Sequence, residues 1–174
     1  MLTDKLRKYR IILASGSLRR QQLLRETGID FEIVLRDFDE SFPEGLEGEH
    51  IARYVVSAKS KVFSQSVKEG EIVITADTIV WCDRKLLGKP ENEADAIRML
   101  KAISGRTHEV ITAVSLLTIG RNTVFTDTTR VTFRAMSDAE IHHYVDKYAP
   151  YDKAGAYGIQ EWIGLAACSR IEGS

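Results

Sequence analysis

Two arginines stand at the predicted start of a helix. Arg19 and Arg20 follow Ser17 by two and three residues, and serine is a preferred helix-capping residue. Cations are disfavoured at the positive end of the helix dipole, whereas an anion would be held there by backbone N–H groups and both guanidinium groups. The spacing therefore indicates a phosphate site. The alternative is that both side chains are solvated or pair with the acidic loop near Asp39.

An aspartate interrupts the most apolar strand-like segment of the chain. Asp77 lies within residues 71–81, which are otherwise rich in isoleucine and valine. An ionised carboxylate in such a run is costly unless a cation, a metal or hydrogen-bond donors compensate it. Asp77 could be a metal ligand, or a general base that takes a proton from an attacking water. A structural aspartate, hydrogen-bonded to Thr75, Thr78 or a loop backbone, is the alternative.

Three lysines are further candidates for binding phosphate: Lys59, Lys61 and Lys89. Lys89 stands between Gly88 and Pro90, where a loop can hold its ammonium group in place. A Walker A loop is excluded, because that motif needs Ser or Thr after the lysine. Surface lysines are common, so an ordinary solvated residue is the alternative for each of them.

An acidic loop could supply a second carboxylate for a hard cation. It contains Asp37, Asp39 and Glu40, and magnesium prefers one or two carboxylates together with substrate phosphates. Zinc is not predicted, because the four histidines lack ligand spacing and His142 and His143 are adjacent. Neither Ser15 nor Ser17 has a recognisable His and Asp pair, so a serine hydrolase is not supported.

A Gly-rich segment near the carboxyl end could recognise a base. Gln160 can present both a donor and an acceptor to a pyrimidine edge. Tyr157 and Trp162 flank it and could stack on the base. For Trp162, packing in the core is the favoured role.

Composition indicates one domain over residues 1–174. The chain has 174 residues, is 44% hydrophobic and carries a net charge of -1, so it can bury a core and has no global field that attracts nucleic acid or anionic lipid. Cys82 and Cys168 lack a disulfide or metal-binding spacing. The apolar stretch 11–14 is too short for a secretory signal. We therefore expect a cytoplasmic protein with no nucleic-acid or membrane partner.

Strand and helix patterns alternate along the chain, which predicts an α/β fold with a mixed, twisted sheet flanked by helices. A capping box at Ser137–Glu140 begins the last predicted helix, and Pro150 ends it. The predicted strands are 10–15, 31–35, 71–81, 109–117, 123–135 and 163–171, and the other predicted helices are 18–27, 49–67 and 93–104.

Five segments together resemble the Maf family of nucleotide pyrophosphatases. They are ASGSLRRQQLL (14–24), ADTIV (76–80), LGKP (87–90), SGRTHEVITAV (104–114) and DKAGAYGIQ (152–160). The resemblance implies a fold like that of inosine triphosphatases. GRTH together with DKAGAYGIQ is similar to the branch that hydrolyses dTTP and UTP to the monophosphate and pyrophosphate, with magnesium or manganese as the implied cofactor. The family resemblance also allows a homodimer.

By position, the resemblance assigns the site residues. The implied catalytic residues are Asp77, Glu40 and Lys89, with Glu40 and Asp77 as metal ligands. The implied substrate-binding residues are Ser15, Arg19, Arg20, Lys59, Thr78 and Gln160, Lys59 being preferred to Lys61 for its spacing to Asp77. A noncatalytic nucleotide-binding regulator of cell division, and a phosphohydrolase that releases orthophosphate, are the alternative functions.

The sequence departs from the family pattern at three places. Leu18 stands where a proline usually precedes the arginine pair, so the first helical turn loses a residue that would preset it. Glu161 stands where many members have glycine, beside Gln160. Family members usually continue beyond the position of Ser174, so a shortened carboxyl end is expected.

Overall fold

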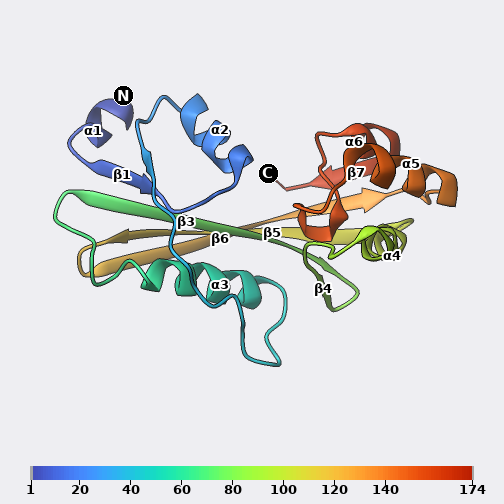
Figure 1. Cartoon of the computed structure of the whole chain (residues 1–174), viewed down its shortest axis with the longest axis horizontal. Coiled ribbons are helices and arrows are strands. Elements are labelled where there is room, and N and C mark those ends of the chain that lie inside the picture. Colours follow the sequence, from blue (N-terminus) through green and yellow to red (C-terminus); the bar gives the residue numbers. More distant parts are fainter. Residues whose placement is uncertain (1, 174) are drawn as a thin grey trace. The chain divides into compact units, whose positions relative to one another are not determined.

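The computed structural model describes residues 2–173 and has the predicted mixed α/β architecture (Figure 1). Seven strands form one sheet in the order β2-β1-β3-β5-β6-β7, and β4 pairs with β3. The strands are β1 (Arg10–Leu13), β2 (Glu32–Ile33), β3 (Glu71–Cys82), β4 (Lys85–Leu87), β5 (Thr107–Thr118), β6 (Arg121–Phe133) and β7 (Cys168–Glu172). The helices are α1 (Leu2–Leu6), α2 (Leu18–Glu26), α3 (Glu49–Lys61), α4 (Glu93–Ile103), α5 (Asp138–Tyr148) and α6 (Trp162–Ala167), with a short 3-10 turn η1 (Ala154–Ala156).

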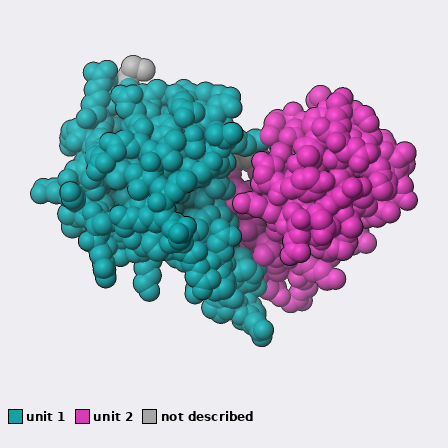
Figure 2. Space-filling view, in the orientation of Figure 1, with its two compact units in different colours: residues 1–46, 50–77, 113–126 teal, residues 47–49, 78–112, 127–174 magenta. Residues whose placement is uncertain are grey.

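The chain divides into two compact units, shown in different colours in Figure 2. The first unit contains the residues up to 46, 50–77 and 113–126. The second unit contains 47–49, 78–112 and the residues from 127 onwards. The boundary falls inside β3, so Asp77 closes the first unit along this strand and Thr78 opens the second.

Parallel strand pairing organises the first unit. β1 lies between β2 and β3 and is parallel to both, with Leu13 opposite Ile33 and Ile74. Helices α2 and α3 lie on opposite sides of β3 (Figure 1). Ile12, Phe63, Val73 and Leu117 form a buried apolar cluster, so β1 and the first residues of β3 are held against one core.

The second unit contains the larger apolar cluster. β3 turns into β4 through Asp83 and Arg84, whose φ angles of 49° and 61° are both left-handed, as a tight hairpin turn requires. α4 and α5 pack against each other. Their apolar faces, including Leu100, Ile103 and Tyr144, are fully buried.

Capping residues define three helix starts. Ser17, Asn92 and Ser137 each accept a hydrogen bond from a backbone N–H of the first helical turn. The predicted capping box is confirmed, because the Ser137 side chain and the Glu140 side chain satisfy each other's backbone N–H groups. None of the helices within residues 2–173 is both long and apolar enough to span a bilayer.

Some predicted boundaries were wrong. α3 ends at Lys61 rather than residue 67, because the N–H groups of Phe63 and Val67 bond in turns to the carbonyl oxygens of Ser60 and Phe63. The predicted strand 163–171 is α6 followed by β7. Ile163 and Ala167 are four residues apart and both buried, a spacing that puts them on one helical face.

Candidate active site

The loop that joins β1 to α2 is fixed beside β3. The Ala14 N–H donates to the Ile74 carbonyl at 2.8 Å, which continues the parallel pairing beyond the end of β1. Ser15 is buried, and its Oγ accepts a 3.3 Å hydrogen bond from the Ser17 N–H. Gln21 donates to the Ser15 carbonyl from within α2 at 3.4 Å. The carboxyl end of a parallel strand and a helix amino terminus therefore meet here, which is where α/β folds commonly bind phosphate.

The two arginines of the first turn of α2 differ in burial. Arg20 is half-buried and donates through its guanidinium to the Ala76 carbonyl at 2.9 Å. Burial lowers the pKa of Arg20, and the negative charge of Asp77 partly offsets this. Arg19 is exposed. Leu18 is 79% exposed, and α2 still begins there with its Ser17 cap, so the helix start forms without proline.

A lysine compensates the carboxylate in the apolar strand. Lys59 of α3 donates from Nζ to Oδ1 of Asp77 at 2.6 Å. Their side chains are 16% and 21% exposed, so the pair is largely withdrawn from water but reachable. The Lys59 ammonium group also lies over the Phe38 ring, 5.0 Å from its centroid. The choice of Lys59 over the exposed Lys61 agrees with this geometry.

The threonines on either side of Asp77 have partners of their own. Thr75 is buried and donates to the Val56 carbonyl at 3.2 Å. The hydroxyl of Thr78 lies 3.1 Å from that of Thr112. Asp77 is thus a charged residue held by Lys59, with the positive charge of Arg20 close enough to act on it.

The acidic loop lies at the edge of this arrangement. Phe38 contacts Lys59 as described, and Glu40, two residues further on, is exposed. Within the part of the chain that is described, no group of three or more His, Cys, Asp and Glu residues could hold a metal ion. In the first unit, the structure thus brings together Ser15, Arg20, Lys59 and Asp77. Arg19 and Glu40 are exposed side chains of the same unit.

The other predicted site residues belong to the second unit. The Gly155 N–H donates to the Gly88 carbonyl at 2.9 Å, so the loop before Lys89 lies against the 152–155 segment. The pKa of Asp152 is lowered, chiefly by its hydrogen bond from Lys153 and to a smaller degree by the charge of Lys89. Lys89 and Gln160 are both exposed.

Tyr157 is a core residue, which contradicts the possibility that its ring stacks on a base. It is 7% exposed, and its hydroxyl lies 2.7 Å from Nε2 of the buried His108. Its ring also packs edge-on against Phe133. Burial lowers the pKa of His108 to about 4, so the imidazole is neutral at pH 7.

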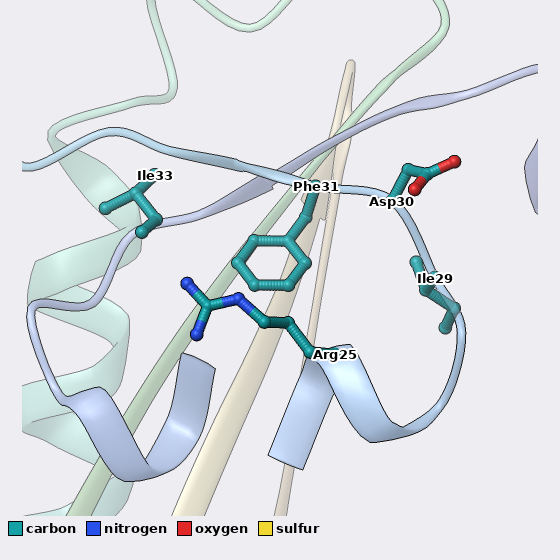
Figure 3. Close-up of a pocket in the computed structure, with 5 residues that line it drawn as sticks. All are labelled: Arg25, Ile29, Asp30, Phe31 and Ile33. Carbon is teal, nitrogen blue, oxygen red and sulfur yellow. The ribbon is translucent and has the colours of Figure 1, made fainter. Parts of the chain in front are cut away.

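A separate pocket of about 280 Å³ lies on the first unit (Figure 3). It is lined by Arg25, Ile29, Asp30, Phe31 and Ile33. The guanidinium group of Arg25 lies 5.7 Å from the centre of the Phe31 ring. None of the predicted site residues lines this pocket.

Comparison with known families settles the relationship. The family model described as "Maf-like protein" matches residues 10–174. The chain belongs to the Maf family. A Maf relative from Flavobacterium johnsoniae, named dTTP/UTP pyrophosphatase, is 50% identical over 174 residues, which cover 100% of this chain and 90% of the relative. A relative of the same name from Bacteroides thetaiotaomicron is 48% identical, over 99% of this chain and 90% of its own length.

A solved structure supports the predicted fold. The Staphylococcus aureus Ham1 protein matches with a TM-score of 0.50 over 71% of each chain. The sequence identity is 14%, so this comparison concerns the fold alone.

Residues that were not predicted to belong to the site contact Tyr157 and Glu161 on either side of Gln160. Lys153 and Tyr144 contact Glu161, next to Gln160, and His108 contacts Tyr157. Lys153 and His108 stand inside the DKAGAYGIQ and GRTH motifs, and this position was the signal that could have indicated them. Tyr144 lies in α5, outside all five motifs, and its inward-facing helical position indicates only burial.

Proposed function

We propose that this chain hydrolyses dTTP and UTP to the nucleoside monophosphate and pyrophosphate. Its Maf-family relatives carry the name dTTP/UTP pyrophosphatase. The observation that carries the proposal is the Asp77 carboxylate, which strand β3 and Lys59 hold in place while Arg20 packs against the neighbouring Ala76 carbonyl. A rigidly held carboxylate beside cationic groups suits the attack of water on a phosphoanhydride.

We assign Asp77 the role of accepting a proton from the attacking water. The Lys59 ammonium group keeps the carboxylate oriented, because it donates to one of its two oxygens. The N–H groups at the start of α2, together with Arg19 and Arg20, bind phosphate oxygens. Ser15 shapes the loop that presents these N–H groups.

Three residues of the second unit receive roles from the family pattern. Lys89 neutralises phosphate charge, and Gln160 recognises the base through its amide, which can donate and accept. Both side chains are exposed and accessible to a ligand. Thr78 follows Asp77 directly along β3 and takes part in substrate binding.

A divalent cation fits the donor set as a partner of the nucleotide. Magnesium commonly binds through one or two carboxylates plus substrate phosphates rather than in an all-protein cage. Asp77 and Glu40 are the carboxylates that would hold it. When bound, such an ion neutralises phosphate charge and makes its bound water more acidic.

A nucleotide panel tests the proposal. The protein is incubated with dTTP, UTP, dCTP, dATP and dGTP in magnesium or manganese, and pyrophosphate and orthophosphate are measured separately. We expect pyrophosphate release that is fastest from dTTP and UTP. Release of orthophosphate would contradict the reaction type. Tight nucleotide binding by calorimetry with no turnover would instead favour a noncatalytic regulator.

A further inference from the structure

Two pairs of side chains fix a long loop of the first unit to the end of α3. Residues 34–48 connect β2 to α3 without a helix or strand of their own, and this loop passes alongside α3 (Figure 1). A loop of this length is ordered only where contacts with the rest of the fold hold it. The side chains at positions 36 and 38 supply such contacts.

The first pair places a cation of the loop on an aromatic ring of the core. The Arg36 guanidinium group lies over the Phe63 ring, 4.4 Å from its centroid, and its Nη1 donates to the Val62 carbonyl at 2.7 Å. Phe63 is 4% exposed and belongs to the apolar cluster with Ile12 and Val73. Arg36 therefore ties the beginning of the loop to the core of the first unit.

The second pair reverses these roles. Here the loop supplies the aromatic ring, since the half-buried Phe38 lies 5.0 Å from the Lys59 ammonium group of α3. Lys59 and Phe63 are four residues apart, the spacing of one helical face. Arg36 and Phe38 are two residues apart, the spacing of one side of an extended chain. The two spacings match, so both pairs form together and set the register of the loop along α3.

The Phe38 ring lies on the same ammonium group that orients Asp77. Lys59 donates to Oδ1 of Asp77 at 2.6 Å, and its side chain is 16% exposed. A cation within about 6 Å of an aromatic face is attracted to it, and the attraction is stronger where water is excluded. A lysine stem is flexible. The ring therefore restrains Lys59 in the position from which it donates to the carboxylate.

We propose that Arg36 and Phe38 are positioning residues that clamp the acidic loop onto α3 and hold the Lys59 ammonium group against Asp77. Neither residue touches the substrate in this role. Phe38 acts through Lys59, and Arg36 acts by fixing the loop that carries Phe38. The catalytic part of the inference rests on the proposed function, because Asp77 is the carboxylate to which that function assigns the proton.

The kinetics of pyrophosphate release from dTTP test the catalytic part. Phe38→Leu keeps an apolar side chain but removes the aromatic face. We expect kcat to fall by about fivefold, which corresponds to about 1 kcal/mol, with KM within about twofold of wild type, because the variant loosens the proton acceptor and no group that binds substrate. Phe38→Tyr retains the aromatic face and should keep kcat within about twofold of wild type.

Phe31→Leu is the matched control. Phe31 is half-buried in the same unit and also has a cation over its ring, the Arg25 guanidinium group (Figure 3). It lines a pocket that contains none of the predicted site residues. The kcat of Phe31→Leu should therefore equal that of wild type.

Hydrogen exchange tests the clamp in the absence of nucleotide. The exchange rate of the backbone amides in segment 36–41 is measured by mass spectrometry in wild type, Phe38→Leu, Lys59→Met and the double variant. We expect about fivefold faster exchange in each single variant and no further increase in the double variant, because both changes remove the same contact. Arg36→Met keeps an apolar stem over Phe63 but loses the cation and the hydrogen bond. Its exchange should also be about fivefold faster.

Three outcomes would overturn the inference alone. Phe38→Leu could retain the wild-type kcat, Phe38→Tyr could lose as much kcat as Phe38→Leu, or the changes at 38 and 59 could accelerate exchange independently, by about 25-fold together. All three leave pyrophosphate release by the wild-type protein intact, so the proposed function would stand. A wild-type protein that releases no pyrophosphate from any nucleotide would overturn the proposed function and the catalytic part of the inference, and the exchange rates would still decide whether the clamp exists.

Discussion

Replacement of Lys59 by methionine removes the cation that holds Asp77 and keeps an apolar stem beside Phe38. Exposed ion pairs contribute about 0–1 kcal/mol to stability, whereas breaking a buried pair costs about 3–5 kcal/mol. The side chains of Lys59 and Asp77 are 16% and 21% exposed, which places this pair between those limits. We expect Lys59→Met to lower the free energy of unfolding by about 2 kcal/mol.

Urea unfolding at pH 7 measures this change in a double-mutant cycle. The cycle compares wild type, Lys59→Met, Asp77→Asn and the double variant, and we expect a coupling energy of about 1 kcal/mol or more between the two positions. Lys61→Met is the matched control, because Lys61 is exposed on the same helix. It should change stability by less than about 0.5 kcal/mol. A coupling below about 0.3 kcal/mol would refute the conclusion that Lys59 compensates the charge of Asp77.

Three further changes probe the second unit, and a fourth, Gly120→Ala in the first unit, is the control for one of them. The depressed pKa of His108, about 4, makes its stabilising effect complete above pH 6.5 and lost as the pH falls toward 4. Calorimetry should therefore show that Tm decreases less for His108→Gln than for wild type as the pH falls from 6.5 to 4. An equal decrease in the two proteins would refute the buried neutral state of His108. Ser137→Ala removes a helix cap and should cost about 1 kcal/mol in urea unfolding; no change would show that the cap is dispensable. Gly155→Ala should cost about 2 kcal/mol or more, because φ is 68° and the new Cβ would lie 2.9 Å from Val80. Gly120 has a φ of 70°, but a new Cβ there would have no atom within 4 Å, so Gly120→Ala should cost about 1 kcal/mol. Equal losses of stability in Gly155→Ala and Gly120→Ala would exclude a steric clash with Val80 as the cause.

Local patterns predicted the elements whose signals lie within one turn or one strand. The capping box at Ser137 and Glu140 fixed the start of α5, since both partners are three residues apart in the sequence. β3 followed from its β-branched run, and α2 from the Ser17 cap. Asp77 stood out for the same local reason, because a charge inside an apolar strand needs compensation.

The partners of these residues depend on tertiary structure and were not readable from spacing alone. Lys59 reaches Asp77 only because α3 packs beside β3, which the sequence does not specify without the family pattern. The bond between Tyr144 and Glu161 joins α5 to the Gly-rich turn in the same way. Ile163 to Ile171 had the composition of a strand, but burial of Ile163 and Ala167 on one face made its first half helical.

The most direct measurement is the rate of pyrophosphate release from dTTP by Asp77→Asn, beside wild type, with circular dichroism to confirm that both are folded. Asparagine keeps the shape of the side chain but cannot take a proton from water. We predict that kcat falls by about 10²–10⁴-fold, the usual contribution of a general base. A folded Asp77→Asn variant that releases pyrophosphate at a rate within about threefold of wild type would contradict a catalytic role for this carboxylate.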